Sequence, residues 1–187
     1  GYARADSGFC IGTSCITAWP EGEVTGTGTA NYLPIWTTSS NIGNSVVYQS
    51  GSNVGIGTTS PNQQLEITGN FRVPTTTYAN QSGIIYKGAD RFIHDFNYGY
   101  NGTVTMDGRN TFVGINAGNF TMGSTATGSH HASYNTGIGS YALSANTTGY
   151  YNSAMGTYAL YSNTTGSYNT AMGRDALFAN TTGFYNS

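Results

Sequence analysis

Residues able to carry out acid–base chemistry are few in this chain. It has three histidines, His94, His130 and His131, and eight acidic residues scattered along the sequence. His94 and Asp95 are neighbours, and neighbours on a strand point to opposite faces, so this pair is a poor candidate for hydrolysis. Sugar-cleaving enzymes use two carboxylates that flank one bond, and the sequence does not indicate such a pair. We therefore expect no catalytic residues and no enzymatic activity.

The adjacent histidines His130 and His131 are the candidate metal ligands. If three copies of the chain met on an axis, one histidine from each copy would supply three ligands. The pair lies in the polar segment 124–133, so we favour solvated loop histidines over a metal site. The C-terminal repeats lack the aspartates of calcium-binding solenoids, and the Gly-x-Gly at residues 55–57 opens no helix for a dinucleotide. No metal and no cofactor are expected.

The two cysteines, Cys10 and Cys15, lie on either side of Gly-Thr-Ser, which is typical of a tight hairpin turn. A disulfide across this turn is sterically reasonable and would indicate an oxidising compartment. The alternative is two free or metal-binding thiols, but a zinc site needs four ligands and each chain supplies one pair. We favour the disulfide and assign residues 1–25 to an N-terminal disulfide hairpin segment.

A 17-residue repeat fills the C-terminal third of the chain. It begins at Tyr134 and restarts at Tyr151, Tyr168 and Tyr185. Each copy is too short for a helix pair, and it carries several glycines and an Asn-Thr-Thr-Gly turn. Two short strands and two turns per copy predict one layer of a β-solenoid, with layers stacked about 4.8 Å apart.

A longer repeat is expected before the regular ones. Residues 110–118 resemble the segment that starts at Asn135, which lies 25 residues later. This offset is one repeat plus eight residues, and the extra residues are expected near 121–131. We predict that the repeat solenoid covers residues 110–187 and, because the sequence stops inside a repeat, that it continues beyond residue 187.

Comparison of the repeat copies predicts which side chains face a core. One position is always apolar but varies in shape, and an Ala-Leu pair is constant. The positions that hold Arg174 and Asp175 in one copy are expected to face water. The predicted core columns are Ile138, Met155 and Met172, and Leu143, Leu160 and Leu177, and the predicted turn ladder is Asn146, Asn163 and Asn180.

The predicted core of a single chain is thin. Each layer offers roughly three apolar side chains worth about 1–3 kcal/mol each on burial. Ordering the residues of one layer costs on the order of 1.5 kcal/mol per residue. We therefore expect copies of the chain to share a core, and we favour a homotrimer over a monomeric solenoid with the same repeats.

Composition excludes several classes of protein. Charged residues make up 7% of the chain and the net charge is −2, so there is no basic patch for nucleic acid. No apolar run is long enough to span a membrane. The 27 glycines and 15 tyrosines, without a Gly-X-Y period, are typical of an uncharged β-fibre that is not collagen. The expected fold class is all-β: short β-rich modules followed by a β-solenoid (β-roll) of 17-residue repeats, as a trimer.

Two further modules are expected before the repeats. Residues 26–73 contain short β-rich runs separated by Thr, Ser and Gly turns, which predicts a β-rich fibre module. Residues 74–109 form an irregular β module or linker, with strands expected near 83–87 and 91–96.

The order of the motifs in residues 26–187 resembles bacteriophage tail fibres and related bacterial surface fibres, many of which end in an endosialidase-type chaperone. The motifs are Gly-Thr-Ala-Asn-Tyr-Leu-Pro-Ile-Trp at 28–36, Ile-Gly-Asn-Ser at 42–45, Asn-Val-Gly-Ile-Gly-Thr-Thr-Ser-Pro at 53–61 and the segment 64–73. The repeats are also similar to the head repeats of trimeric autotransporter adhesins. This resemblance implies a left-handed parallel β-roll trimer.

These observations predict a structural subunit of an extracellular homotrimeric fibre, a surface filament or tail-fibre shaft with an adhesive role, at a cell surface or on a virion. Its expected partners are copies of itself, as a trimer and an end-to-end filament, and a cell-surface glycan or receptor. The alternative is a glycan-binding or glycan-cleaving phage tail spike. The exposed aromatics would stack on sugars or shield the layer edges, and we favour shielding. These aromatics are Tyr141, Tyr150, Tyr158, Tyr161, Phe178 and Phe184.

Overall fold

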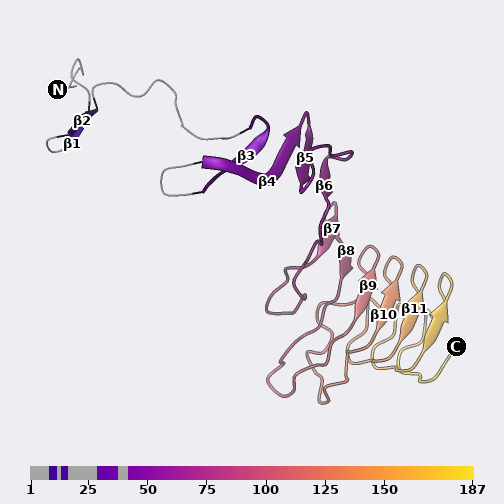
Figure 1. Cartoon of the computed structure of the whole chain (residues 1–187). Helices are drawn as coiled ribbons and strands as arrows, with labels where there is room; N and C mark the ends of the chain where they lie inside the picture. Colours follow the sequence, from indigo (N-terminus) through magenta and orange to yellow (C-terminus); the bar gives the residue numbers. More distant parts are fainter. Residues whose placement is uncertain (1–8, 12–13, 17–28, 38–41) are drawn as a thin grey trace, which may run out of the picture. The chain divides into compact units, whose positions relative to one another are not determined.

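A computed structural model describes residues 9–11, 14–16, 29–37 and 42–187; in 9–11, 14–16, Trp36 and Ile42 it describes the backbone alone. Within these residues the chain is all-β and has no helix, as predicted (Figure 1). Accordingly, the described part of the chain offers no helix that could cross a membrane. The chain divides into two compact units, Gly1–Phe71 and Arg72–Ser187, so the division lies close to the predicted module boundary at residue 73.

The N-terminal cysteines lie on paired strands. Strand β1 (Phe9–Ile11) runs antiparallel to β2 (Ser14–Ile16), and Cys10 is directly opposite Cys15. This pairing agrees with the predicted hairpin. The cysteine side chains lie outside the described residues, so the disulfide remains a prediction.

We expect Cys10 and Cys15 to be oxidised to a disulfide under non-reducing conditions. Residues directly opposite each other on antiparallel strands have α-carbons about 4.5–5.5 Å apart, which is within the range that a disulfide spans. Intact-mass spectrometry without reductant should give a mass lower by two hydrogens, and iodoacetamide should label the chain only after reduction. Labelling of both thiols before reduction would contradict this prediction.

The first unit contains a four-stranded sheet in the order β3-β4-β5-β6. Strands β3, β4 and β5 are antiparallel neighbours, and β5 pairs in parallel with β6. The strands are β3 (Tyr32–Trp36), β4 (Ile42–Ser50), β5 (Asn53–Ile56) and β6 (Leu65–Ile67). The turn between β4 and β5 contains Gly51, whose positive φ of 58° suits glycine.

The second unit contains a six-stranded sheet in the order β12-β11-β10-β9-β8-β7. Strands β7 and β8 are antiparallel to each other, and β8 is antiparallel to β9. The strands from β9 to β12 are parallel. The strands are β7 (Ile85–Lys87), β8 (Asp90–His94), β9 (Thr111–Val113), β10 (Thr136–Ile138), β11 (Ser153–Met155) and β12 (Thr170–Met172). Residues 74–109, which we predicted as an irregular module or linker, thus contribute two strands to the sheet of the repeats.

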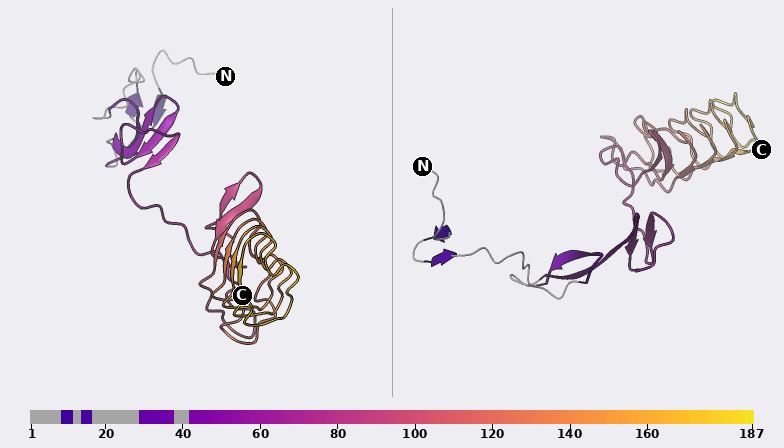
Figure 2. Two further views of the ribbon diagram at one scale, coloured as in Figure 1. Left: turned by 90° about the vertical axis from the view of Figure 1, so that its right-hand side faces the viewer. Right: turned by 90° about the horizontal axis from the view of Figure 1, so that it is seen from above.

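The four parallel strands belong to four stacked layers of backbone, which we number by their residues: layer 1 (109–133), layer 2 (134–150), layer 3 (151–167) and layer 4 (168–184). Thr136 pairs with Ser153 and Ser153 with Thr170, so equivalent residues of successive copies lie side by side. Seen along the stack, the backbone turns of successive layers nearly superpose (Figure 2, left). Thr111 pairs with Thr136, which confirms the predicted offset of 25 residues for layer 1.

The extra residues of layer 1 form an insertion at one corner. Thr147 and Thr148 of layer 2 are consecutive, yet their carbonyls accept hydrogen bonds from the amides of Gly123 and Ala132. The eight residues 124–131 between these two donors have no counterpart in layer 2. This position agrees with the predicted insertion and places His130 and His131 within it.

The core of the second unit lies inside the layers. The central residue of each repeat strand points inward: Phe112 in layer 1, Gly137 in layer 2, and alanine in layers 3 and 4. Leu143 and Leu160 are fully buried, which confirms the predicted leucine column, and Leu177 in layer 4 packs partly buried against the same core.

The other predicted core column, Ile138, Met155 and Met172, points outward. These side chains are 37%, 49% and 75% exposed in the chain, so the prediction that they fill its core is wrong. Successive residues of a strand face opposite sides, and the inward position before each of them holds glycine or alanine. The narrow interior accepts these small residues, and the larger apolar residue is left on the outer face of the sheet.

Candidate interaction surface

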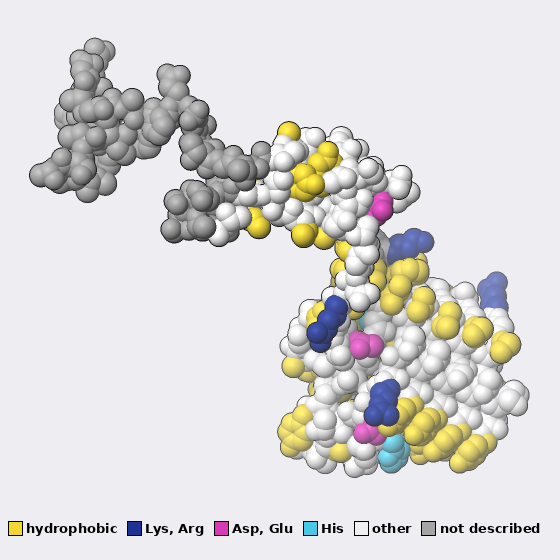
Figure 3. All heavy atoms as spheres, in the orientation of Figure 1, with side chains coloured by type: hydrophobic (Ala, Val, Ile, Leu, Met, Phe, Trp, Pro, Cys, Tyr) yellow, Lys and Arg dark blue, Asp and Glu magenta, His cyan; other side chains and the backbone are white. Residues whose placement is uncertain are grey.

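The outer face of the repeat sheet is uncharged. The outward residues of β9 to β12 form one column of Thr or Ser and one column of Val, Ile or Met. We call these two columns the outer repeat face: Thr111, Thr136, Ser153 and Thr170, and Val113, Ile138, Met155 and Met172. In the space-filling view, rows of hydrophobic side chains run across successive repeats with uncharged side chains between them (Figure 3). A partner that covers this face would therefore bury no charge of this chain.

An apolar row crosses all six strands of the sheet. Strand register places each member of this row directly beside the next. The row is Ile85, Ile93, Val113, Ile138, Met155 and Met172. All of them are at least 36% exposed except Val113, which is half-buried. A continuous apolar row of this length on a monomer is typical of an interaction site.

Beside the outer repeat face runs a column of stacked tyrosines. The rings of Tyr134, Tyr151, Tyr168 and Tyr185 have successive centroid distances of 4.6, 5.2 and 4.9 Å, with tilts of 16° or less. Arg109 occupies the equivalent position in layer 1, and its guanidinium carbon lies 5.6 Å from the centroid of the Tyr134 ring. The arginine therefore ends the column with a cation–π contact.

Four of the six surface aromatics that we predicted are stacked in the same way. Tyr141 stacks on Tyr158 with centroids 5.4 Å apart, and Tyr161 stacks on Phe178 at 5.1 Å. Tyr150 instead makes edge contacts with neighbouring tyrosines, and Phe184 is 52% exposed. A sugar ring stacks on an open aromatic face, whereas each stacked ring covers a face of its neighbour and leaves mainly edges exposed. The geometry of the stacked pairs therefore favours shielding of the layers over sugar binding.

The predicted asparagine ladder at the turns is present. Asn163 Nδ2 donates to Asn146 Oδ1 at 3.1 Å, and Asn180 Nδ2 donates to Asn163 Oδ1 at 3.0 Å. Each of these amides also donates to the carbonyl of the glycine three residues later in its own turn. The ladder therefore joins layers 2, 3 and 4 and closes each turn.

A second asparagine ladder, inside the layers, was not predicted. Its members are Asn135, Asn152, Asn169 and Asn186, and the first three are completely buried. Asn152 Oδ1 accepts hydrogen bonds from both the backbone and side-chain nitrogens of Asn169, each at 3.1 Å. The same pair of bonds links Asn135 to Asn152 and Asn169 to Asn186. The signal in the sequence was the invariant asparagine after each repeat tyrosine, which we did not assign to the interior.

The two ladders meet at shared glycine carbonyls. The carbonyl of Gly149 accepts from the side-chain amides of both Asn135 and Asn146. Gly166 does the same for Asn152 and Asn163 one layer later. Every buried amide of these two ladders thus has partners within its own layer and in an adjacent one, as buried polar groups require.

His94 is buried beneath layer 1 and does not form a catalytic pair. Its Nε2 lies 2.9 Å from the carbonyl of Ala117, and its Nδ1 accepts from the amide of Phe96 at 3.2 Å, an arrangement that fits a neutral ring protonated at Nε2. Burial lowers the pKa of His94 to about 4. The Asp95 carboxylate instead accepts from the backbone amide of Thr76 at 2.7 Å, so the two neighbours serve separate structural contacts.

Aromatic rings surround His94 at this end of the core. The His94 ring contacts Phe112 and Phe120 at centroid distances of 5.0 and 4.7 Å, and Phe120 stacks on Phe96 at 4.3 Å. The guanidinium carbon of Arg91 lies 4.1 Å from the centroid of the Phe120 ring. This aromatic cluster covers the end of the core at layer 1, the first of the four layers.

We expect the second unit to lose stability as the pH falls from about 6.5 to about 4. The unfolded chain binds a proton at His94 with the ordinary pKa of 6.5, whereas the folded chain resists protonation down to about 4. Between these values the unfolded state binds more protons, so the contribution of neutral His94, on the order of 3 kcal/mol, is present above 6.5 and lost toward 4. Urea unfolding at several pH values measures this loss, and the variant His94→Gln should flatten the dependence in this window. An equal slope in both proteins would contradict the assignment.

His130 and His131 lie in the insertion of layer 1, where their rings contact each other and Tyr150. The backbone amide of Thr127 donates to His131 Nδ1 at 3.3 Å, which occupies one possible metal-binding nitrogen. Burial and the neighbouring His130 lower the pKa of His131. Over the described ranges, no group of three or more His, Cys, Asp or Glu side chains is placed to hold a metal ion.

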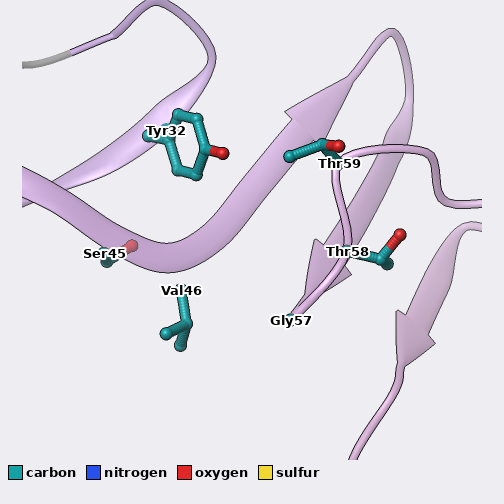
Figure 4. A pocket seen from close by; sticks show the side chains of 6 residues that line it. All are labelled: Tyr32, Ser45, Val46, Gly57, Thr58 and Thr59. Carbon is teal, nitrogen blue, oxygen red and sulfur yellow. The ribbon is translucent and has the colours of Figure 1, made fainter.

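Two depressions in the described part of the chain differ in the groups that line them. One in the first unit has a volume of about 510 Å³ and is lined by hydroxyl and apolar groups (Figure 4). Its lining residues are Tyr32, Ser45, Val46, Gly57, Thr58 and Thr59. Another, in the second unit, has a volume of about 240 Å³ and is lined by residues that include Ile85, Ile93, His94 and Asp95. Both ring nitrogens of His94 already have backbone partners.

Comparison with known proteins gives no relative: no family model, no curated protein and no solved structure matches the chain. The stacked layers, their ladders and the uncharged outer repeat face are therefore the basis for a functional proposal. The surface of the layers repeats from one layer to the next, and the described side chains form no group that could carry out catalysis.

Proposed function

We propose that this chain is a structural subunit of an extracellular homotrimeric fibre, in which the repeats form a β-solenoid shaft. The observation that carries the proposal is the pair of asparagine ladders. Each layer offers the next the same hydrogen-bonding groups, so the stack is stiffened by every repeat added. Such a design gives length and rigidity with the same surface from layer to layer, which is what a shaft requires.

The outer repeat face supports association of three copies. Ile138, Met155 and Met172 form an exposed apolar column, and a parallel symmetric arrangement would bring the same residue of each copy to the same height. The chain carries few charges, so copies can approach without repulsion. The number three comes from the resemblance of the repeats to trimeric adhesin heads.

The shaft is favoured over the enzymatic or glycan-binding tail spike. His94 and Asp95 make separate backbone contacts, and the stacked aromatic columns cover their ring faces. An extracellular location is part of the proposal and rests on the resemblance and on the expected disulfide. An adhesive contact with a glycan or receptor at the cell surface would be made by parts of the fibre other than the stacked rings.

We expect Met155→Asp to dissociate the trimer and leave the layers folded. Met155 is 49% exposed in the single chain, so a carboxylate is tolerated there in a monomer. In a trimer interface the same carboxylate would be buried without a partner, at a cost of about 3–5 kcal/mol per chain. Light scattering coupled to size-exclusion chromatography measures the mass, and circular dichroism measures the retained β structure.

The matched control is Thr157→Asp. Thr157 lies two residues after Met155 in the same layer and is exposed, but it is outside the outer repeat face. This variant should keep the mass of the unmodified protein. If both variants keep that mass, the outer repeat face is not the trimer interface. If Met155→Asp unfolds the layers, the side chain of Met155 belongs to the core of the chain.

A further inference from the structure

The first unit has an apolar sheet face whose described side chains are all exposed or half-buried. Register places Val47 beside Ile56 and Ile56 beside Ile67 on one face, and Val54 beside Leu65 on the same face. Leu33 lines a depression of about 310 Å³ together with Val47 and Val54. We call these residues the first-unit apolar face: Leu33, Val47, Val54, Ile56, Leu65 and Ile67.

This unit lacks a core of its own among its described side chains. None of its described Leu, Ile, Val, Tyr or Phe side chains is buried, and Leu33 and Leu65 are 58% and 59% exposed. Among the described side chains, the buried hydrophobic cluster starts only at Phe96, in the second unit. A sheet is stable when its apolar face packs on a second layer, so another element must cover this one.

The charge pattern indicates what that element is. No charged residue occurs between Glu23 and Glu66, and Glu66 pairs with Gly55 on the face opposite the apolar one. A partner recognised by charge would find nothing to bind here. An uncharged apolar face is instead complementary to another copy of itself, which a symmetric homo-oligomer brings together.

We infer that other copies of this chain cover the first-unit apolar face, so that the sheet of β3 to β6 reaches its stable fold only on assembly. The inference rests on the proposed homotrimer and adds a second interface, in which three single-layer sheets enclose a common core. The apolar side chains that a single chain leaves exposed then become the interior of the fibre module.

Photocrosslinking of the full chain tests this inference. A benzophenone amino acid replaces Leu33, and two copies with different affinity tags are co-expressed and irradiated. We expect crosslinked products that carry both tags, with the attachment sites mapped by mass spectrometry to residues 47–67 of the other copy. The same amino acid at Val46, which is 69% exposed and outside the apolar face, should give few such products.

The possible results separate the inference from the proposed function. Crosslinks from position 33 to residues 1–28 of the same chain would overturn the inference, because that segment would then be the cover. Absence of two-tag products from a protein that sediments as a trimer would also overturn it and leave the shaft proposal intact. A protein that sediments as a monomer would overturn both.

Hydrogen exchange gives an independent test. Leu65→Asp should make the amides of β4, β5 and β6 exchange at least about tenfold faster, because the carboxylate disrupts the shared core. The amides of β9 to β12 should keep their protection. Val46→Asp is the control and should change neither set. Unchanged exchange in Leu65→Asp would contradict the inference.

Discussion

Replacement of Gly156 by alanine is expected to prevent stacking of layer 3 on layer 4 and to lower the free energy of unfolding by more than about 3 kcal/mol. An added Cβ would overlap the backbone carbonyl of Gly173 in the next layer. The φ of Gly156 is also 141°, a conformation that residues with a side chain rarely adopt. The ladders hold the two layers together on both sides of this point, so the backbone has no room to move apart.

Gly173→Ala is the matched control for this prediction. Gly173 has a φ of 120°, but an added Cβ would meet nothing within 4 Å. Both variants therefore carry the backbone strain, and the difference between their urea unfolding curves isolates the overlap between layers. Equal destabilisation by the two substitutions would show that layer contact does not require glycine.

Asn152→Leu is expected to destabilise the second unit by about 2–5 kcal/mol, although the side chains are similar in size. The substitution removes the acceptor for the backbone and side-chain nitrogens of Asn169. It also removes the amide that donates to Asn135 Oδ1 and to the carbonyl of Gly166. Each buried polar group left without a partner costs about 1–3 kcal/mol, and the backbone amide of Asn169 has no other acceptor.

The same substitution at Asn186 serves as the control. Asn186 is only partly buried, and its backbone nitrogen still donates to Asn169 Oδ1 after the side-chain donor is removed. We expect Asn186→Leu to cost less than half as much in thermal or urea unfolding. A larger loss at Asn186 than at Asn152 would contradict a ladder whose strength lies in its buried middle.

Periodicity in the sequence predicted the stacking of equivalent residues, although each repeat has one strand where we predicted two. The spacing of the repeat tyrosines predicted the register of β10, β11 and β12, and the offset of layer 1 predicted its insertion. The Leu143 column and the Asn146 ladder followed from positions that never vary between copies. Positions in stacked layers face the same environment in each copy, so comparison within one chain is informative.

The direction of short strands could not be predicted in the same way. Each repeat strand has three residues, so alternation gives one inward residue between two outward ones, or the reverse. We assigned Ile138 to the interior because its position is apolar in every copy, whereas the narrow interior takes Gly137 and the leucines of the Leu143 column. An apolar side chain that points outward is favourable when another surface covers it. A single sequence does not reveal whether such a surface exists.

The cluster at the start of the layers was also not predictable from the repeats. His94 ends β8, and Phe96 and Phe120 lie outside the strands, at positions where the regular repeats offer no equivalent residue for comparison. Their role depends on contacts across the end of the core, such as the stacking of Phe96 on Phe120. The sequence marked His94 only as a neighbour of Asp95, and its buried position emerges from the fold.

Sedimentation equilibrium of the unmodified chain under non-reducing conditions tests the proposed fibre most directly. A homotrimer should sediment at three times the chain mass of 19.7 kDa, at all loading concentrations in the micromolar range. The trimer should also retain its β-sheet circular dichroism. A folded species of 19.7 kDa over the same concentrations would contradict the account, because the outer repeat face and the first-unit apolar face would then remain uncovered in solution.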